Sequence, residues 1–390
     1  MARIESRHGR WRARVWAPDG RERSRTFDRK SDAERWAVTQ EADKHRGAWI
    51  DPTLGRETFE SWSKTWRADL QRRPRTLRRY DTVLANHLLP RFGRTPLVRI
   101  TRSDAQRMVA DDIEHGYSAS EVRRHVIVLR QILEAAVKDG RLGRNVAADV
   151  ELPSEQARTM RFLTPEQLGA LATAHGDHYA PLVLTAGWVG LRWGELAGLR
   201  LERVDLLRHK IRIDQQLVED AGNLTFGPPK TRAGDRTVTM PSGLTDVLAA
   251  HFASKACQRS GMAFPTVTGQ LMRRSNFRRL WRRKVGGSAK RVGVFAGTDL
   301  EGLVFHELRH TAAALAIAHG AHPQTIKERL GHSSITVTMD TYGHLFPSAD
   351  EALADALDAA FRDAHPAFTR PGLAESGADA QVRGLRAPTS

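Results

Sequence analysis

Residues 304–310 read VFHELRH, and this stretch admits two incompatible interpretations. In the pattern H-E-x-x-H, His306 and His310 lie one helical turn apart and bind zinc, while Glu307 acts as a general base. In the pattern H-x-x-R, His306 and Arg309 form the functional pair instead. The first interpretation predicts a metalloprotease and the second a different chemistry, so the surrounding sequence has to decide.

The composition favours a polyanionic partner. The chain has 390 residues, a formal charge of +16 and a pI of about 10.7, and neutralising phosphates releases condensed counterions. This length allows two or three domains. The single cysteine, Cys257, excludes an internal disulfide framework and fits a reducing cytosol. The first residues have no apolar signal core, and no run reaches the roughly 18 apolar residues of a membrane span. We therefore expect a soluble, cytoplasmic protein.

The N-terminal region predicts a small sheet followed by a helix. Residues 10–27 alternate around a Pro-Asp-Gly turn, as in a β-hairpin. Ser31 or Asp32 is the expected cap of a helix that runs to about Lys44. The arginines of this unit, including Arg12 and Arg14, either cover a solvated sheet face or face a DNA groove.

Residues 57–143 predict four short helices. Apolar residues recur at three- and four-residue steps, and Thr58, Thr101 and Ser120 are expected caps. Several arginines decorate this bundle, namely Arg75, Arg78, Arg79, Arg123, Arg124 and Arg130. Residues 151–161 read as a polar linker.

From Leu163 the pattern changes to α+β. Thr164 is the expected cap of a helix with Pro165 in its first turn, and the apolar helix 179–190 ends at Gly190. The segments KIRIDQQL (210–217), LTFGPP (224–229) and RTVTMP (236–241) predict three short strands. Helices follow to about Phe361, and the stretch from about Pro366 has the composition of a disordered tail. We find no internal repeats.

Four short motifs in this region stand out, and their order along the chain matters more than any one of them alone. GLRWGEL (190–196) places Arg192 after Gly190, with Glu195 three residues later. Lys230 lies on a turn between two predicted strands, and HELRH (306–310) follows. RLGHSSITVTMDTYGH (329–344) contains His332 and Tyr342. Taken singly, each has an ordinary structural explanation, such as a surface arginine, a solubilising lysine, a capping histidine or a core tyrosine.

Taken together, and in this order, the motifs resemble the tyrosine recombinase (phage integrase) family. That family has an arginine in a G-L-R-x-G-E-like turn, a hairpin lysine, H-x-x-R, a histidine in L-G-H and then the tyrosine. The matching residues here are Arg192, Lys230, His306, Arg309, His332 and Tyr342. The resemblance is specific over residues 163–346. The helical region looks like the family's core-binding domain, and residues 1–50 look like an arm-type DNA-binding domain.

The resemblance implies a multidomain fold, mainly α with small β-sheets. The expected divisions are an arm-binding unit at 1–50, a core-binding domain at 57–150, a catalytic domain at 160–350, and a C-terminal helix and tail at 351–390. The C-terminal helix, around Asp350–Phe361, is expected to dock either on a neighbouring protomer or on its own domain.

The implied function is site-specific DNA recombination that integrates or excises a prophage or other mobile element. Tyr342 would attack the DNA phosphate and form a 3′-phosphotyrosyl intermediate, while Arg192 and Arg309 hold the developing charge. Lys230 would be the general acid, His306 would assist proton transfer or orient the phosphate, and His332 would bind a non-bridging oxygen. Glu195 would orient Arg192 or brace its turn rather than react.

The resemblance also implies the partners. No cofactor, ATP or metal is required, because the phosphotyrosine stores the energy of the broken bond. Four protomers would assemble on two duplexes carrying attachment sites in the nucleoid of a bacterial host. An excisionase or a DNA-bending host protein is a further expected partner.

The zinc interpretation explains less of the sequence. Glu328 is the nearest candidate for a third ligand, eighteen residues beyond His310. A zinc site accounts neither for Arg192 and Lys230 nor for the charge, and His310 is then a structural neighbour of Arg309. The basic stretch RRSNFRRLWRRK (273–284) is either a solvated helix face or, through Arg274, Arg278 and Arg282, a set of phosphate contacts.

Two further functions remain as alternatives. A type IB topoisomerase uses the same nucleophile as a monomer, and it would relax supercoils without making recombinants. A DNA-bound regulator could retain the fold without turnover, and it would form no covalent adduct with nicked DNA.

Overall fold

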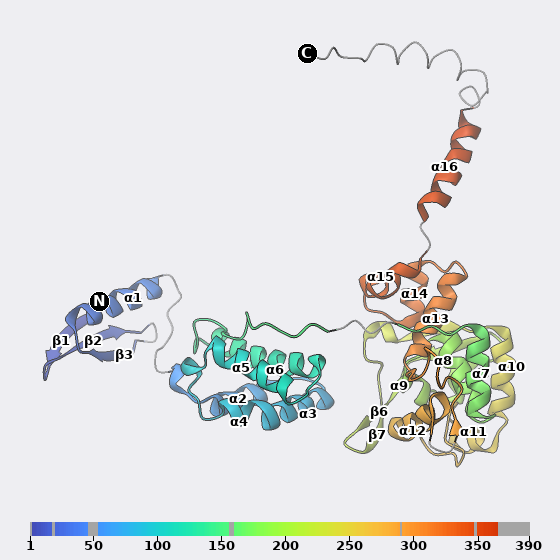
Figure 1. Cartoon of the computed structure of the whole chain (residues 1–390), viewed down its shortest axis with the longest axis horizontal. Helices are drawn as coiled ribbons and strands as arrows, with labels where there is room; N and C mark the ends of the chain where they lie inside the picture. Colours follow the sequence, from blue (N-terminus) through green and yellow to red (C-terminus); the bar gives the residue numbers. More distant parts are fainter. Residues whose placement is uncertain are drawn as a thin grey trace, which may run out of the picture. The chain divides into compact units, whose positions relative to one another are not determined.

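The structure is a computed structural model that describes residues 2–17, 20–45, 54–155, 160–288, 291–346 and 349–365 (Figure 1). The chain separates into two compact units, Met1–Arg158 and Thr159–Ser390. Both units are mainly helical with small antiparallel sheets, which confirms the predicted fold class. The finer division into four parts stays a prediction.

The N-terminal part of the first unit is a three-stranded sheet covered by a helix. Its elements are β1 (Arg3–Arg7), β2 (Arg10–Trp16), β3 (Glu22–Phe27) and α1 (Lys30–His45). The predicted hairpin is β2–β3, whereas β1 was not predicted. Ala13 and Val15 of β2 pack against Ala33 and Ala37 of α1, which buries one face of the sheet. The Pro18-Asp19 turn lies outside the described residues.

The start of α1 differs from the prediction. The helix begins at Lys30, so that Ser31 and Asp32 lie inside its first turn and are not its cap. Asp32 is nevertheless favourable there, because a carboxylate interacts well with the positive N-terminal end of a helix.

The rest of the first unit is the predicted helical bundle. Its helices are α2 (Phe59–Asp69), α3 (Pro74–Val83), α4 (Leu89–Phe92), α5 (Arg102–Glu114) and α6 (Ala119–Lys138). A π-helical turn, η2 (Leu84–Leu88), joins α3 to α4, and η1 (Leu54–Arg56) and η3 (Leu97–Arg99) are single 3₁₀ turns. Large apolar side chains such as Phe59, Trp62 and Leu129 form a core separate from that of the N-terminal sheet.

The helix caps follow the local sequence closely. Thr58 and Thr101 cap α2 and α5 as predicted. The prediction of Ser120 was wrong, because Ser118 caps α6. Ser118 has Glu121 three residues later, and the two exchange hydrogen bonds in a capping box that Ser120 has no acidic partner to form.

The second unit opens with helices and two small sheets. The first helices are α7 (Pro165–His175), α8 (Ala180–Val189) and α9 (Trp193–Ala197), with Thr164 capping α7 as predicted. One sheet has the order β4 (Val204–Asp205), β5 (Lys210–Ile213), β8 (Arg236–Thr239), and the other is a hairpin of β6 (Gln216–Asp220) and β7 (Asn223–Gly227).

Helices complete this unit after β8. They are α10 (Ser242–Phe252), α11 (Lys255–Ser260), α12 (Arg274–Val285), α13 (Glu307–Ala318), α14 (Pro323–Leu330), α15 (Ile335–Tyr342) and α16 (Ala349–Ala364). The minor elements are β9 (Gly287–Ser288), β10 (Arg291–Val292), η4 (Leu201–Arg203), η5 (Arg232–Gly234) and η6 (Gly343–Leu345). The predicted C-terminal helix corresponds to α16, and the predicted tail beyond it lies outside the described residues.

One predicted strand was wrong. The segment 210–217 is divided between β5 and β6, which belong to different sheets. The chain leaves the first sheet at Asp214, which pairs with Arg203 at 2.9 Å, and at Gln215, which donates to the carbonyl of Gly198 at 2.8 Å. These side-chain contacts turn the backbone away, although the apolar pattern alone continues through the break.

Helix α8 is the centre of the second unit. Leu182, Val183 and Ala186 are at most 1% exposed, and α7 and α13 pack against this helix. Within the described residues, no helix is both long and apolar enough to cross a bilayer.

Gly190 ends α8 where two other helices approach closely. Its φ of 79° lies in the left-handed region, which favours glycine. A Cβ atom at this position would lie 2.7 Å from Leu330 Cδ2 and 3.2 Å from Ala312 Cβ. The absence of a side chain therefore lets α13 and α14 pack onto the end of α8.

We predict that Gly190→Ala lowers the free energy of unfolding by about 2–4 kcal/mol, the sum of left-handed strain and overpacking. Gly261→Ala is the matched control, since Gly261 is also left-handed but has open space around its Cβ. It should lose about 1–2 kcal/mol from strain alone. Equal losses for the two variants in urea unfolding would contradict the close-packing argument.

Candidate active site

The predicted site residues come from five segments of the second unit. Arg192 immediately precedes α9, and Lys230 is exposed on the connection between β7 and β8. His306 precedes α13, which contains Arg309. His332 follows α14, and Tyr342 is the last residue of α15.

Three arginines donate to successive carbonyl groups at the C-terminal end of α14. Arg236 Nε binds the Arg329 oxygen at 2.8 Å, Arg309 Nη2 binds the Leu330 oxygen, and Arg192 Nη2 binds the Gly331 oxygen at 3.0 Å. The last carbonyls of a helix have no intrahelical donor and carry partial negative charge. This helix end therefore both orients the guanidinium groups and partly balances their charge.

Glu195 supplies a full negative charge to the same cluster. It is 2% exposed and binds Arg192 Nη1 at 2.9 Å and Arg236 Nη2 at 3.0 Å. Burial raises the pKa of Glu195, but Arg236 and Arg192 outweigh burial and hold it below its usual value. The carboxylate is thus ionised at neutral pH, and it orients Arg192 as predicted.

Arg309 is the most deeply buried of the predicted cations. It is 4% exposed and donates from Nη1 to the carbonyl of Gly190, the residue that ends α8, at 2.7 Å. Burial and the charge of Arg192 lower the pKa of Arg309 to about 9. The guanidinium therefore remains charged at neutral pH.

Tyr342 is packed inside the domain in this state. It is 1% exposed and lies among Ala313, Ile317, Ile326 and Leu330. Its hydroxyl is 2.9 Å from His310 Nδ1. Burial raises the pKa of Tyr342 to about 12, and the charge of Arg309 opposes this rise. The phenol is therefore neutral, and DNA can reach its oxygen only after a local rearrangement.

Two histidines border the cationic cluster. The rings of His332 and Tyr342 are nearly parallel with centroids 6.3 Å apart, and His332 Nδ1 is hydrogen-bonded to Thr338 Oγ1 at 2.9 Å. Burial and the charges of Arg309 and Arg192 lower the pKa of His332 to about 4. For His306, partial burial, His310 and Arg309 likewise lower the pKa to about 4, although part of its ring is exposed. Both imidazoles are neutral at physiological pH.

The segment that carries Lys230 approaches this cluster through Gly331. A Cβ on Gly331 would lie only 2.7 Å from the Ala233 oxygen, on the same β7–β8 connection as Lys230. The backbone of Gly331 also has a left-handed φ of 66°. Glycine at this position therefore allows the lysine-bearing connection to pack beside the turn that presents His332.

The zinc interpretation of HELRH does not fit this geometry. Glu307 is 5% exposed and accepts two hydrogen bonds from Arg161, of 3.1 and 3.0 Å, as well as one from the Val304 amide. His310 is engaged with Tyr342, and the proposed third ligand Glu328 is exposed and bound by Gln324. The glutamate is a structural anchor rather than a base facing substrate.

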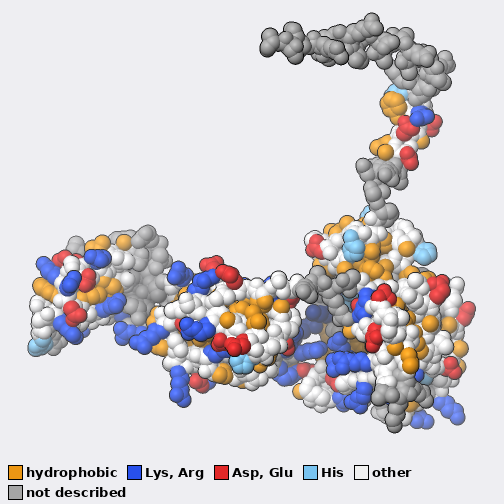
Figure 2. Space-filling model, viewed as in Figure 1, with side chains coloured by type: hydrophobic (Ala, Val, Ile, Leu, Met, Phe, Trp, Pro, Cys, Tyr) orange, Lys and Arg blue, Asp and Glu red, His pale blue; other side chains and the backbone are white. Residues whose placement is uncertain are grey.

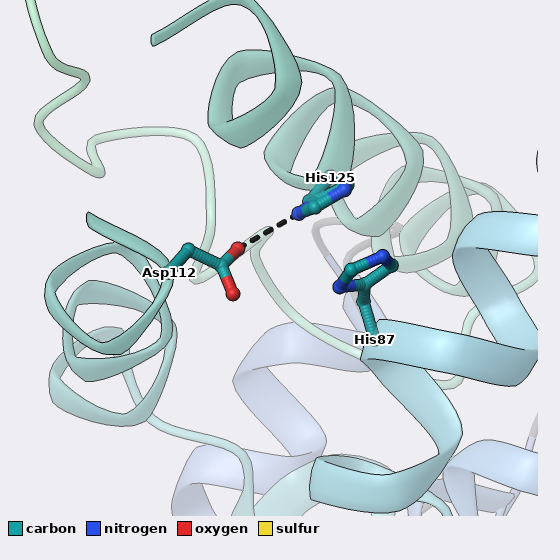
Figure 3. Close-up of side chains that lie close together, drawn as sticks. All are labelled: His87, Asp112 and His125. Carbon is teal, nitrogen blue, oxygen red and sulfur yellow. Dashed lines mark hydrogen bonds and ion pairs between the residues drawn. The ribbon is translucent and has the colours of Figure 1, made fainter. Parts of the chain in front are cut away.

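Among the described residues, one group of three side chains has the spacing of a metal site (Figure 3). His125 Nδ1 lies 2.8 Å from Asp112 Oδ2, and the His87 ring stacks on that of His125 with centroids 3.7 Å apart. However, Arg91 Nη1 lies 2.8 Å from Asp112 Oδ1. An arginine already balances the buried carboxylate, so the group is better explained as a polar network that joins α5, α6 and the π turn.

A basic face adjoins the candidate active site. Arg274, Arg278 and Arg282 are exposed at four-residue steps on α12, and with His306 and Trp193 they line a cavity of about 770 Å³. Figure 2 shows Lys and Arg side chains gathered on the second unit. The three arginines are positioned to contact a polyanion that enters beside His306.

The other arginines predicted to bind DNA differ in their availability. Arg75 and Arg78 are exposed on α3. Arg12 bonds to Ser24, and Arg14 pairs with Glu5 and Glu22 on the open face of the N-terminal sheet. Arg123 donates twice to the carbonyl of Pro153 and so attaches the following segment to α6. Contacts between these residues and DNA stay a prediction.

Comparison with known proteins identifies the family. Residues 161–348 match the model of the phage integrase family, and residues 58–111 match the phage integrase N-terminal SAM-like domain. Together the two matches cover more than half of the chain. The chain belongs to the phage integrase family of tyrosine recombinases.

Individual family members match along most of their length. The putative prophage phiRv2 integrase of Mycobacterium tuberculosis is 28% identical over 363 residues, which cover 90% of this chain and 92% of the relative. The integrase of Mycobacterium phage D29 is 27% identical, with coverage of 85% and 88%.

Solved integrase structures share the fold. The Tn1549 transposon integrase in complex with transposon right end DNA has a TM-score of 0.66 at 20% identity, covering 78% of this chain and 100% of that one. A lambda integrase tetramer bound to a Holliday junction has a TM-score of 0.51 at 18% identity, covering 87% and 94%.

Three residues of this integrase site were not predicted to have functional roles. Arg236 could have been found, because it alternates with the buried Val238 in β8 and so faces inward. Arg161 lies in a segment that was predicted to be a linker, and no residue near it in the sequence indicates its contact with Glu307. His310 was predicted to be structural, yet it contacts the predicted nucleophile.

We predict that the melting temperature of the full chain falls as the pH is lowered from about 6.5 towards about 4. Folding depresses the pKa of His332, so the unfolded chain binds more protons in this window and protonation favours unfolding. His332→Asn should show a smaller fall than wild type in calorimetry. The difference between the two melting temperatures at pH 7.5, where His332 is neutral, measures the effect of the altered hydrogen bond to Thr338 alone. If wild type and His332→Asn lose the same number of degrees between pH 6.5 and pH 4, the lowered pKa of His332 is contradicted.

Proposed function

We propose that this integrase cuts and rejoins DNA at specific sites with Tyr342 as the nucleophile, through a covalent 3′-phosphotyrosyl intermediate. The reaction integrates or excises the prophage or mobile element to which the gene belongs. The observation that carries the assignment is that Arg192 and Arg309 meet at one end of α14. Tyr342, His306 and His332 all lie close enough for the charge of Arg309 to shift their pKa values.

The arginines suit the charge that develops during phosphoryl transfer. Attack on the phosphate concentrates negative charge on the non-bridging oxygens, and fixed guanidinium forks stabilise it without reorganising. Arg192 and Arg309 already have their orientation set by helix carbonyls and by Glu195. His332 would bind one non-bridging oxygen, and His306, exposed beside Arg274, would orient the phosphate or assist proton transfer.

Lys230 is the proposed general acid for the departing 5′ oxygen. It is exposed on a connection whose neighbouring segment packs against Gly331, next to His332. A flexible ammonium group can reach the leaving oxygen once DNA is bound. The phosphotyrosyl bond conserves the energy of the broken linkage, so rejoining to a partner strand needs neither ATP nor a metal ion.

Tyr342 has to become accessible before it can attack. Its side chain is 1% exposed, and the chain continues directly from it into η6. We therefore infer that binding of DNA uncovers the phenol, which limits cleavage to the protein–DNA complex.

The partners follow from the same assignment. We propose that residues 160–350 cleave DNA, that residues 57–150 bind the core site, and that residues 1–50 bind arm-type sites. Arg274, Arg278 and Arg282 would contact phosphates next to the cleaved one. Four protomers would form the recombining complex at attachment sites in the nucleoid of the host. An excisionase or a DNA-bending protein would decide between integration and excision. Helix α16 would dock on its own domain or on a neighbouring protomer.

The nucleophile is tested with a nicked duplex made from the DNA that flanks the gene. Cleavage close to the nick releases a short oligonucleotide that diffuses away. Because the strand can then no longer be rejoined, the covalent adduct accumulates. We expect wild-type protein to form the adduct, and Tyr342→Phe to bind the duplex with similar affinity but form none, because it lacks the attacking oxygen. A persistent adduct in Tyr342→Phe on denaturing gels would refute the assignment.

The arginine clamp is tested with the same duplex. Arg192→Ala and Arg309→Ala should each slow cleavage of bound DNA by roughly 10²–10³-fold, about 3–4 kcal/mol of transition-state stabilisation. Arg329→Ala is the matched control, since Arg329 also donates to helix and strand carbonyls, those of Trp188 and Thr239. Cleavage rates that fall equally in all three variants would show a structural effect rather than charge stabilisation.

A further inference from the structure

The hydroxyl of Tyr342 contacts a histidine that is not among the six predicted catalytic residues. His310 Nδ1 lies 2.9 Å from this oxygen. Within the described part of the chain, the hydroxyl makes no other hydrogen bond. The rest of the phenol is packed against apolar side chains of α13 and α14. Among the described residues, His310 is therefore the polar group in direct contact with the phenolic oxygen.

We propose that His310 is the base that takes the phenolic proton of Tyr342 during strand cleavage and returns it during rejoining. This inference rests on the proposed function, because it assigns a role within that reaction. His310 would then be a catalytic residue in its own right, in contact with the reacting oxygen.

The chemical state of His310 fits an acceptor. Burial and the charge of Arg309 keep the pKa of His310 below its ordinary value, so the ring is neutral at physiological pH. A neutral imidazole has one bare nitrogen and one N–H group. The proposal assigns the tautomer in which Nε2 holds the proton and Nδ1 is bare, so that the phenol donates across the 2.9 Å contact.

The position of His306 supports a division of labour. His306 lies one helical turn before His310, and the two rings meet edge to face with centroids 5.2 Å apart. Part of the His306 ring is exposed, and it lines the cavity with Arg274 and Arg278. His306 thus faces the side from which a phosphate enters, whereas His310 faces the phenol.

The proposed step balances in protons and bonds. As the Tyr342 oxygen forms its bond to phosphorus, the O–H bond breaks and the proton moves to His310 Nδ1. The bond from phosphorus to the 5′ oxygen breaks, and that oxygen takes a proton from Lys230. Rejoining reverses each transfer, so that the 5′ hydroxyl gives its proton to Lys230 and the tyrosine oxygen recovers its proton from His310.

Burial of the phenol explains why the free protein does not hold a reactive phenolate. The pKa of Tyr342 is about 12 and that of His310 is lowered, so the proton remains on the phenol at rest. Bond formation to phosphorus removes the basicity of the phenolic oxygen. Transfer to His310 then becomes favourable only as the attack proceeds, in contact with the bound phosphate.

The test compares cleavage of bound nicked duplex by the full chain with different residues at position 310. His310→Asn retains a side-chain amide that can hydrogen-bond the phenol but cannot take its proton. We expect both His310→Asn and His310→Ala to bind the duplex normally and to cleave on the order of 100-fold more slowly or worse, the usual loss for a general base. His319→Asn, on an exposed histidine at the end of the same helix, is the matched control and should cleave at the wild-type rate.

A second duplex separates this role from that of the general acid. Sulfur replaces the bridging 5′ oxygen at the cleaved phosphate, so that the leaving group is a thiolate that needs no proton. This substrate should restore cleavage by Lys230→Ala but not by His310→Ala or His310→Asn.

Two results would overturn the proposal while leaving the function intact. One is His310→Asn cleaving within about threefold of wild type, because the residue would then only position the phenol. The other is rescue of the His310 variants by the sulfur-containing duplex, which would place His310 on the leaving group. Failure of wild-type protein to form any adduct through Tyr342 is a different result, which rejects the proposed function and this inference with it.

Discussion

The balance of positive charge at the C-terminal end of α14 is the constraint on which the site depends. Arg192, Arg236 and Arg309 donate to three successive carbonyls there, and Glu195 supplies one buried carboxylate. Helix-end dipoles and a single anion hold the guanidinium groups in place without neutralising all their charge. The cluster is thus held in place in the free protein and retains a net positive charge. Preorganisation of this kind is what stabilises a charged transition state most effectively.

The proposed nucleophile is, by contrast, uncharged and buried. Tyr342 is buried and neutral, and its hydroxyl is bonded to His310, although Arg309 lies close enough for its charge to lower the phenol's pKa. In the proposed mechanism, the arginines are in place before DNA binds, whereas the phenol becomes reactive only after DNA binding uncovers it. Such a restriction would benefit a recombinase, since an exposed phenolate beside two arginines would cut DNA without a partner strand to rejoin.

Local patterns in the sequence predicted much of the architecture. Apolar spacing and caps located α2, α5, α7 and α8. The order of short motifs matched the family that the comparisons show, while the roles of the individual site residues stay a prediction. The predictions were wrong or incomplete where contacts between residues far apart in the sequence determine the structure. The break between β5 and β6 depends on Asp214 and Gln215 contacting residues of other elements, and β1 has no turn signal of its own. Likewise, neither the Arg161–Glu307 fork nor the His310–Tyr342 bond can be read from neighbours in the chain.

The most direct measurement is the position of the DNA attachment within the protein. Digesting the trapped adduct with trypsin and nuclease leaves a nucleotide remnant on one peptide, which mass spectrometry can locate. Cleavage after Arg329 and Arg362 yields residues 330–362, in which Tyr342 is the only tyrosine. The account predicts the nucleotide mass on Tyr342 of this peptide. A remnant on any other residue, or an adduct whose 330–362 peptide is unmodified, would contradict it.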